Sequence, residues 1–142
     1  MVSITKNNIR QNIFETVYDT LKAKATSSSY GTSTQPTITA SYIDSADSLP
    51  EIVIGRINNN KEDPVFNRAN YTNNCVQVIG VYAKKNKEVD VLTDNIDEFL
   101  HENKITGVTL IDWNEEDDIY ITNQNKLRSK TITITWKTRR WW

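Results

Sequence analysis

Residues with the chemistry for catalysis or metal binding are few in this chain of 142 residues. A zinc site needs a cluster of Cys and His ligands, whereas the sequence holds one cysteine, Cys75, and one histidine, His101. Cys75 lies in an apolar run without basic neighbours, which favours a buried side chain over a reactive thiol. His101 comes at the end of a predicted helix, where a cation complements the helix dipole. The glycines are scattered and form no phosphate-binding loop, so the sequence predicts neither an enzyme nor a bound cofactor or metal.

The acidic run from Glu115 to Asp118 is the next candidate for chemistry. Its carboxylate oxygens are ligands that Ca²⁺ and Mg²⁺ prefer, but the run lacks the spacing and the glycine of a calcium-binding loop. A solvated turn is therefore the favoured interpretation. A metal-dependent hydrolase or nuclease built on this run stays an alternative, and inactivity with Mg²⁺ or Mn²⁺ would count against it.

Basic and aromatic residues are concentrated at the C-terminal end of the chain. Cations beside large flat side chains hold phosphates and stack bases, and the same residue types are common at the centres of protein interfaces. Contact with a partner protein, a flexible end over residues 138–142 and nucleic-acid binding therefore all stay open. The residues concerned are Lys137, Arg139, Arg140, Trp141 and Trp142.

A strand followed by a helix is the unit on which the rest of the chain is organised. Residues 75–82 are apolar at nearly every position and rich in β-branched side chains, which predicts a central strand buried on both faces. From residue 87 the apolar period changes to three and four, which predicts a helix to residue 100 that is capped by Asn86. The apolar stripe of this helix consists of Val89, Leu92, Ile96, Phe99 and Leu100.

The remaining elements follow from similar patterns. Ile9, Ile13, Val17 and Leu21 recur every four residues and predict an amphipathic helix over residues 6–24. The pattern as a whole predicts a single α/β domain, of the α+β type, over residues 1–142. We expect a mixed, mainly antiparallel sheet of about four to six strands with two helices packed on one face. Besides the central strand, the predicted strands cover residues 37–42, 51–57, 107–113 and 130–137, with a short continuation over 119–122.

Two polar segments, residues 26–35 and 58–74, are expected to be mobile loops because they hold few side chains that a core would bury. The formal net charge of -1 gives no electrostatic reason to expect a membrane or nucleic-acid partner. No apolar run is long enough to span a bilayer, and the N-terminus lacks the pattern of a signal peptide. We therefore expect a soluble protein that is made in a cytoplasm.

The order of these elements resembles that of a viral protein family. An amphipathic helix precedes a strand pair that opens at Pro50, a long polar segment leads to the strand from Val76 to Lys84, and an acidic helix follows directly. A strand from Thr131 to Trp136 closes the domain. In this order the chain is similar to the tail terminator, or tail completion, proteins at the head-tail junction of long-tailed bacteriophages and related viruses. The resemblance covers nearly the whole chain.

The resemblance implies a subunit that forms a hexameric ring on the end of the tail tube, stops tail polymerisation and provides the surface to which the head docks. Its implied partners are further copies of itself, the tail tube protein and a head connector or neck protein. DNA is expected to pass through the channel without sequence-specific binding. The implied location is the tail-neck junction of the virion, after assembly in the host cytoplasm.

Two other functions stay open on the same residues. One is a neighbouring head-closure or neck connector protein, and the other is a small nucleic-acid-binding module that uses the C-terminal Arg and Trp residues. In a ring subunit, loops and exposed anchors would supply the contacts. The residues expected at such interfaces are Arg56, Lys61, Phe66, Arg68, Arg128, Arg139, Arg140, Trp141 and Trp142.

Overall fold

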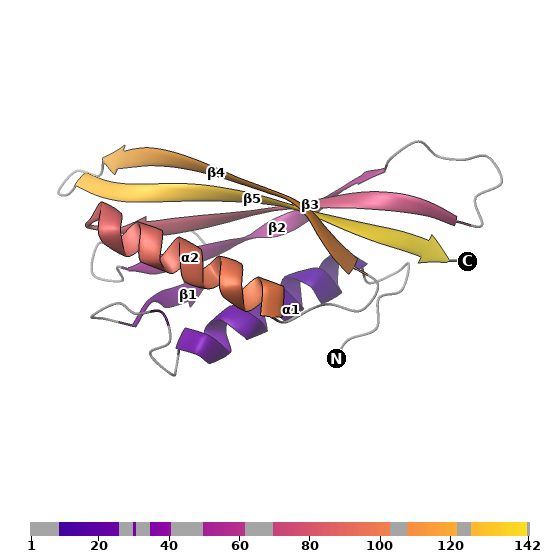
Figure 1. The fold of residues 1–142 in the computed structure, drawn as a ribbon, viewed down its shortest axis with the longest axis horizontal. Helices are drawn as coiled ribbons and strands as arrows, with labels where there is room; N and C mark the ends of the chain where they lie inside the picture. Colours follow the sequence, from indigo (N-terminus) through magenta and orange to yellow (C-terminus); the bar gives the residue numbers. More distant parts are fainter. Residues whose placement is uncertain are drawn as a thin grey trace.

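The structure is a computed structural model that describes residues 9–25, 30, 35–40, 50–61, 70–102, 108–121 and 126–141. Two helices and five strands are present in this described part of the chain (Figure 1). In chain order they are α1 (Ile9–Ala25), β1 (Thr37–Thr39), β2 (Glu51–Lys61), β3 (Asn70–Ala83), α2 (Asn86–Glu102), β4 (Val108–Ile121) and β5 (Lys126–Trp141).

The strands form one mixed sheet in the order β1-β2-β3-β5-β4. β1 runs parallel to β2, and every other neighbouring pair is antiparallel. The apolar strand predicted over residues 75–82 lies within β3, which is the middle strand of the five. The predicted fold class, a mainly antiparallel mixed sheet combined with two helices, is therefore confirmed.

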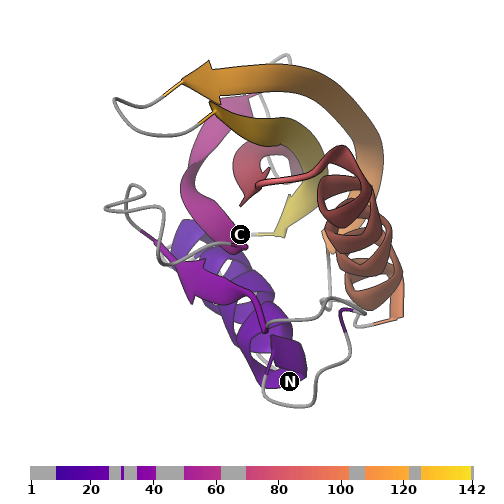
Figure 2. The same ribbon diagram turned by 90° about the vertical axis from the view of Figure 1, so that its left-hand side faces the viewer.

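Both helices cover the same face of the sheet (Figures 1 and 2). α1 packs against β1 and β2, α2 packs against β3 and β5, and the two helices contact each other. Ile13, Val17 and Leu21 of the stripe predicted for α1 are buried, which is the outcome expected for an amphipathic helix on a sheet. The stripe predicted for α2 is confirmed in full, since Val89, Leu92, Ile96, Phe99 and Leu100 are all buried.

The prediction that β3 is buried on both faces is wrong. Ile79 and Val81 are fully buried under the helices, whereas Val78, which points to the other face, is 42% exposed. The helices lie on one side only, so that alternate residues of β3 reach solvent. The apolar residues on the outer face reflect the preference of β-branched side chains for a pleated surface rather than burial.

The hairpin formed by β2 and β3 is longer than the apolar pattern predicted. β2 continues to Lys61 and β3 begins at Asn70, so most of the predicted loop over residues 58–74 is strand. The two strands stay paired as far as Lys61 and Asn73. Residues 62–69, between them, lie outside the described residues. Pairing between neighbouring strands thus extends into a polar stretch that has no strand pattern of its own.

β4 and β5 also exceed their predicted lengths. β4 runs through the acidic run from Glu115 to Asp118, which is therefore strand and not a turn. β5 begins at Lys126 and extends to Trp141, so residues 138–141 of the predicted flexible end belong to a strand. Both strands gain their extra length from the antiparallel ladder that they share and, for β5, from its ladder with β3.

Tyr30 lies within the segment over residues 26–35 that the sequence predicts to be a mobile loop, and it is anchored in the core. Its side chain is fully buried, and its hydroxyl donates a 2.7 Å hydrogen bond to the carbonyl oxygen of Leu21 on α1. The amide of Asn95 on α2 donates a 2.8 Å hydrogen bond to the carbonyl oxygen of Tyr30. Tyr30 thus joins the two helices. Apart from Tyr30 and Gln35, the segment lies outside the described residues.

A buried amide, that of Gln77 on β3, lies beside an irregularity of the sheet. The register between β2 and β3 shifts between Ile54 and Ile57. The amide nitrogen of Gln77 donates a 3.4 Å hydrogen bond to the carbonyl oxygen of Gly55, and the indole nitrogen of Trp136 donates to the Gln77 oxygen at 3.3 Å. The side chain of Gln77 therefore satisfies a backbone group at the register shift and links three strands.

Candidate functional site

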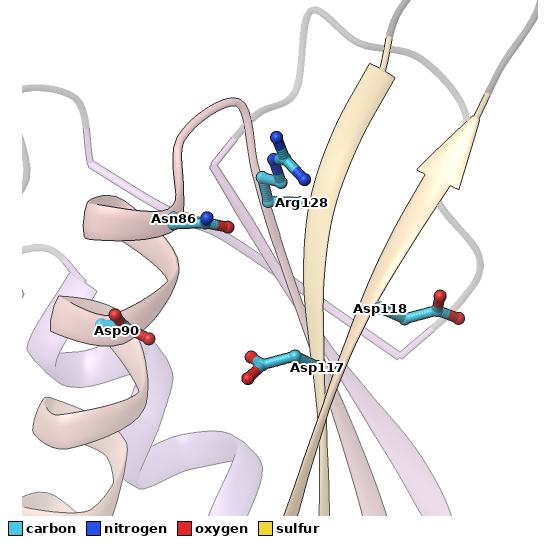
Figure 3. A pocket seen from close by; sticks show the side chains of 5 residues that line it. All are labelled: Asn86, Asp90, Asp117, Asp118 and Arg128. Carbon is cyan, nitrogen blue, oxygen red and sulfur yellow. The ribbon is translucent and has the colours of Figure 1, made fainter.

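Carboxylates are concentrated on α2 and on the edge strand β4. α2 carries six acidic residues and β4 carries five, and Lys87 is the only lysine or arginine in either element. Within the described part of the chain, β4 has β5 as its only strand partner, so its outer edge is open. We call this part of the molecule the acidic side. Its carboxylates do not all share one face, because neighbouring side chains of a strand alternate, and Asp117 points toward α2 whereas Asp118 points away from it (Figure 3). The acidic residues are Glu88, Asp90, Asp94, Asp97, Glu98, Glu102, Asp112, Glu115, Glu116, Asp117 and Asp118.

Helical spacing brings part of α2 next to β4. Asp90, Asp94, Asp97 and His101 are separated by four, three and four residues, so they lie on one stripe of the helix. The ring of His101 lies 6.4 Å from the ring of Trp113 on β4, which places this stripe on the side of α2 that faces β4. Carboxylates from a helix and a strand therefore line the same surface.

Lys130 of β5 lies beneath the carboxylates and is the cation that they share. Its Nζ is 3.2 Å from Asp90 Oδ1, 3.3 Å from Glu115 Oε1 and 3.5 Å from Asp117 Oδ1. Burial lowers the pKa of Lys130, but the hydrogen bonds to Asp90 and Glu115 and the charge of Asp117 outweigh it and raise this pKa above its usual value. One ammonium group among three carboxylates leaves the cluster with an excess of negative charge.

Apolar side chains of β4 lie near the C-terminal end of α2, where His101 meets Trp113. Ile111 is 47% exposed, at a register shift between Leu110 and Asp112, and Trp113 is partly buried against the core. The indole nitrogen of Trp113 donates a 2.6 Å hydrogen bond to Glu115. A register shift of this kind re-aims the side chains of an edge strand. The surface therefore combines negative charge with an exposed aliphatic group and an aromatic ring.

An open hollow of about 470 Å³ lies at the N-terminal end of α2 (Figure 3). It is lined by Asn86 and Asp90 of α2, by Asp117 and Asp118 of β4 and by Arg128 of β5. Asp90 and Asp117 approach each other across it from the helix and the strand. Arg128 was predicted to lie in or beside a loop, whereas it belongs to β5 and pairs with Ala83 of β3 and Ile119 of β4.

The other residues predicted at interfaces lie elsewhere in the sheet. Lys61 is the last residue of β2 and pairs with Asn73 of β3, and Arg139, on the other side of β3, pairs with Thr72. Arg140 and Trp141 follow on β5. The structure thus brings Lys61 and the C-terminal basic residues to the same end of the sheet. Arg128, at the other end of β5, is far from them along the strand.

Three of the predicted interface residues have no described position. Phe66 and Arg68 fall between β2 and β3, and Trp142 follows β5, all outside the described residues. Arg56 is described as a backbone position of β2, within the register shift that follows Ile54. These residues remain predictions as interface contacts.

Sequence reasoning did not bring α2 and β4 together as one surface. The acidic run was visible, but a polar run without alternation gives no sign of strand structure. A signal for the helix was available, because Asp90, Asp94 and Asp97 recur at helical spacing beside the apolar stripe. Nothing in the sequence singles out Lys130 as the residue that links the two acidic elements.

In the part of the chain that the structure describes, no group of three or more His, Cys, Asp and Glu side chains is arranged to hold a metal ion. None of the helices among the described residues is long and apolar enough to cross a membrane. No protein-family model and no curated protein sequence matches the chain. A proposal for the function therefore has to rest on the fold, the charged residues and the exposed strands of this chain.

Proposed function

We propose that the protein is a structural subunit of a virus tail-neck junction, which forms a ring on the end of the tail tube. The ring stops tail polymerisation and provides the surface to which the head docks. In this function the chain binds further copies of itself, the tail tube protein and a head connector or neck protein, and DNA passes through its channel.

The observation that carries the proposal is the extent of the sheet beyond its helices. β3 and β5 continue past both α1 and α2 toward the C-terminus (Figure 1). The strand ends at this place carry Lys61, Arg139, Arg140 and Trp141, and Arg and Trp are residue types common at the centres of protein interfaces. A self-contained monomer gains little from such an extension, whereas an assembly subunit uses it for contact. The order of the elements, a helix, three strands, a second helix and two strands, agrees with the order on which the resemblance to tail terminator proteins rests.

The experiment that tests the proposal uses purified protein and growing tail tubes of the same virus. Negative-stain electron microscopy should show a cap at one end of each tube and a length distribution that stops increasing when the protein is added. Tubes that stay uncapped and continue to grow would contradict the proposal. Tubes that remain bare while the protein binds isolated head connectors would favour the head-closure function instead.

Nucleic-acid binding is the second candidate, and the pairing of β3 with β5 favours it. Arg140 pairs with Tyr71 and Trp141 pairs with Asn70, so basic and aromatic residues occupy neighbouring strands. Open sheets with this composition bind single strands by stacking and by phosphate contacts. Fluorescence anisotropy with a labelled single strand should then show binding that weakens steeply with salt and with Arg139→Ala and Arg140→Ala. The absence of binding at low salt would exclude this function.

A further inference from the structure

β4 forms one margin of the sheet, and its outer edge is open (Figure 1). Among the described residues, β4 pairs with β5 alone, from Val108 to Ile121. In an antiparallel ladder, alternate residues direct their backbone N–H and C=O groups to the paired strand, and the residues between them direct theirs outward. The outer edge of β4 therefore presents a row of backbone donors and acceptors with which a further strand can pair.

The side chains of β4 decide which strand fits this edge. Four consecutive residues, Glu115, Glu116, Asp117 and Asp118, are acidic and exposed, and they alternate between the two faces of the sheet. A partner that docks on one face meets only every second carboxylate. A strand added to the edge has the same alternation as β4, so a run of consecutive cations places one cation opposite each carboxylate on both faces.

The neighbouring strand β5 offsets only part of this charge. Lys130 lies on the face that the helices cover, where it is shared by carboxylates of α2 and β4. On the other face, Glu116 lies opposite Thr131, and Asp112 lies opposite Thr135. Both of these acidic side chains are exposed. The edge therefore keeps an excess of negative charge on both faces.

The same charge disfavours a second copy of β4 as the added strand. Two antiparallel copies aligned along their length, with Val108 opposite Ile121, would bring Asp112 of one copy opposite Asp117 of the other. Two parallel copies in register would oppose each carboxylate to its own counterpart. Like charges directly opposite each other destabilise a strand pair, and charged edge strands are protected in this way against their own copies. A basic segment meets no such barrier.

We propose that the outer edge of β4 is the docking site for an extended, basic segment of a partner protein, which adds to the sheet as a further strand. Backbone hydrogen bonds to β4 supply affinity, and cations opposite the acidic run supply specificity. Ile111, which is 47% exposed at the register shift, precedes the acidic run and favours an apolar residue at one end of the segment. This binding needs neither a ring nor a tail tube, so the inference goes beyond the proposed function and does not depend on it.

The test uses the protein and synthetic peptides of about ten residues, the length of a long strand. The basic probe carries four lysines in a row, flanked by threonine and valine, and it should bind in fluorescence anisotropy at low salt. A second probe has the same sequence with N-methyl groups on the backbone nitrogens of its lysines. These groups block both edges of the peptide and keep its charge, so the second probe should bind at least about tenfold more weakly. Hydrogen exchange should show that the basic probe protects backbone amides of β4.

A charge-reversed variant with a matched control tests the side chains. Asp112→Lys with Glu116→Lys changes two exposed residues that are not among the carboxylates in contact with Lys130, and it should weaken binding of the basic probe at least about tenfold. Glu15→Lys with Asp19→Lys makes the same change in net charge at exposed residues of α1, which packs against β1 and β2, and it should leave binding unchanged. Circular dichroism of each variant confirms that it is folded.

Several results would overturn the proposal. One is a basic probe that does not bind at low salt, and another is a folded β4 variant that binds it as tightly as the unmodified protein. Equal binding of the N-methylated probe would show that attraction between charges alone explains the contact. Protection from exchange confined to elements other than β4 would place the contact elsewhere. Self-association of the unmodified protein that protects the same β4 amides would assign the edge to a second copy instead of a basic partner.

Discussion

The effect of Tyr30→Phe on the free energy of unfolding should change sign with pH: the variant should be less stable than the wild type at neutral pH and more stable at high pH. The hydroxyl of Tyr30 is buried and donates a 2.7 Å hydrogen bond to the Leu21 carbonyl oxygen, while its ring packs edge-on against Phe99 with centroids 5.1 Å apart. Phenylalanine keeps the ring contact and removes the hydrogen bond. At neutral pH, Tyr30→Phe should therefore lower the free energy of unfolding by about 1 kcal/mol.

At high pH the variant should become more stable than the wild type. Burial raises the pKa of Tyr30, because the ionised phenol is poorly solvated in the core. A group whose pKa is raised on folding stabilises the folded state below its unfolded pKa, and this contribution is lost as the pH rises above that value. For tyrosine the loss begins near pH 10 and approaches about 1.4 kcal/mol per pH unit. The variant, which has no ionisable group there, should become the more stable protein at about pH 11.

Urea denaturation followed by circular dichroism, at several pH values from neutral to alkaline, measures both free energies of unfolding. Ionisation of every other group contributes equally to the two proteins to a first approximation and cancels in the difference. Tyr18→Phe is the control at neutral pH, because the Tyr18 hydroxyl accepts its hydrogen bond from Lys22 at an exposed position, and it should cost little. Stability curves of wild type and Tyr30→Phe that stay parallel across the whole range would refute the buried position of Tyr30.

Three further changes test the sheet and the acidic side by urea denaturation. Gln77→Leu should lower the free energy of unfolding by about 2–4 kcal/mol, because it leaves the Trp136 indole nitrogen and a backbone carbonyl buried without a partner. A loss below about 1 kcal/mol, the contribution of one ordinary hydrogen bond, would contradict this expectation. Gly55→Ala should lower the free energy of unfolding more than Gly80→Ala does. A Cβ at Gly55 would lie 2.5 Å from a backbone oxygen, whereas at Gly80 it meets a tyrosine ring that can turn away; equal costs would count against this register. Lys130→Met should lower stability at low salt, since three carboxylates then lack their shared cation, and added salt should recover part of the loss. A loss that salt does not change would contradict the repulsion between them.

The elements that the sequence predicted well are those in which one apolar stripe determines burial. α2 is an example, because each of its buried apolar residues follows from the spacing that begins at Val89. α1 follows from the same rule. The central strand β3 was predicted from a run that is apolar at nearly every position, and such a run does not reveal that Val78 faces solvent.

The features that sequence reasoning missed depend on pairing between distant segments. The acidic run of β4 is strand because β5 pairs with it residue by residue, from Glu115 opposite Ile132 to Asp118 opposite Ser129. Tyr30 is buried because α1 and α2 meet around it, and its polar neighbours in the sequence gave no sign of this. In both cases the local sequence favours a solvated loop, and tertiary contacts decide otherwise.

The same distinction applies to the candidate site. Arg139 and Arg140 were recognised from composition, and the structure adds that their backbone belongs to the long strand β5. Lys130 was not recognised, because its importance comes from Asp90 and Glu115, which are far from it in the sequence. Ion pairs between separate elements leave no local pattern, so they have to be found in the folded chain.

A net charge of -1 concealed the electrostatic organisation of this protein. Net charge bears on solubility and on non-specific attraction, but two opposite excesses that lie on different parts of a rigid sheet cancel in that sum. The eleven acidic residues belong to α2 and β4, whereas Lys137, Arg139 and Arg140 follow one another closely on β5, beside the start of β4. The sum over the chain therefore gives no sign of where each sign of charge lies, and that arrangement has to be read from the folded chain.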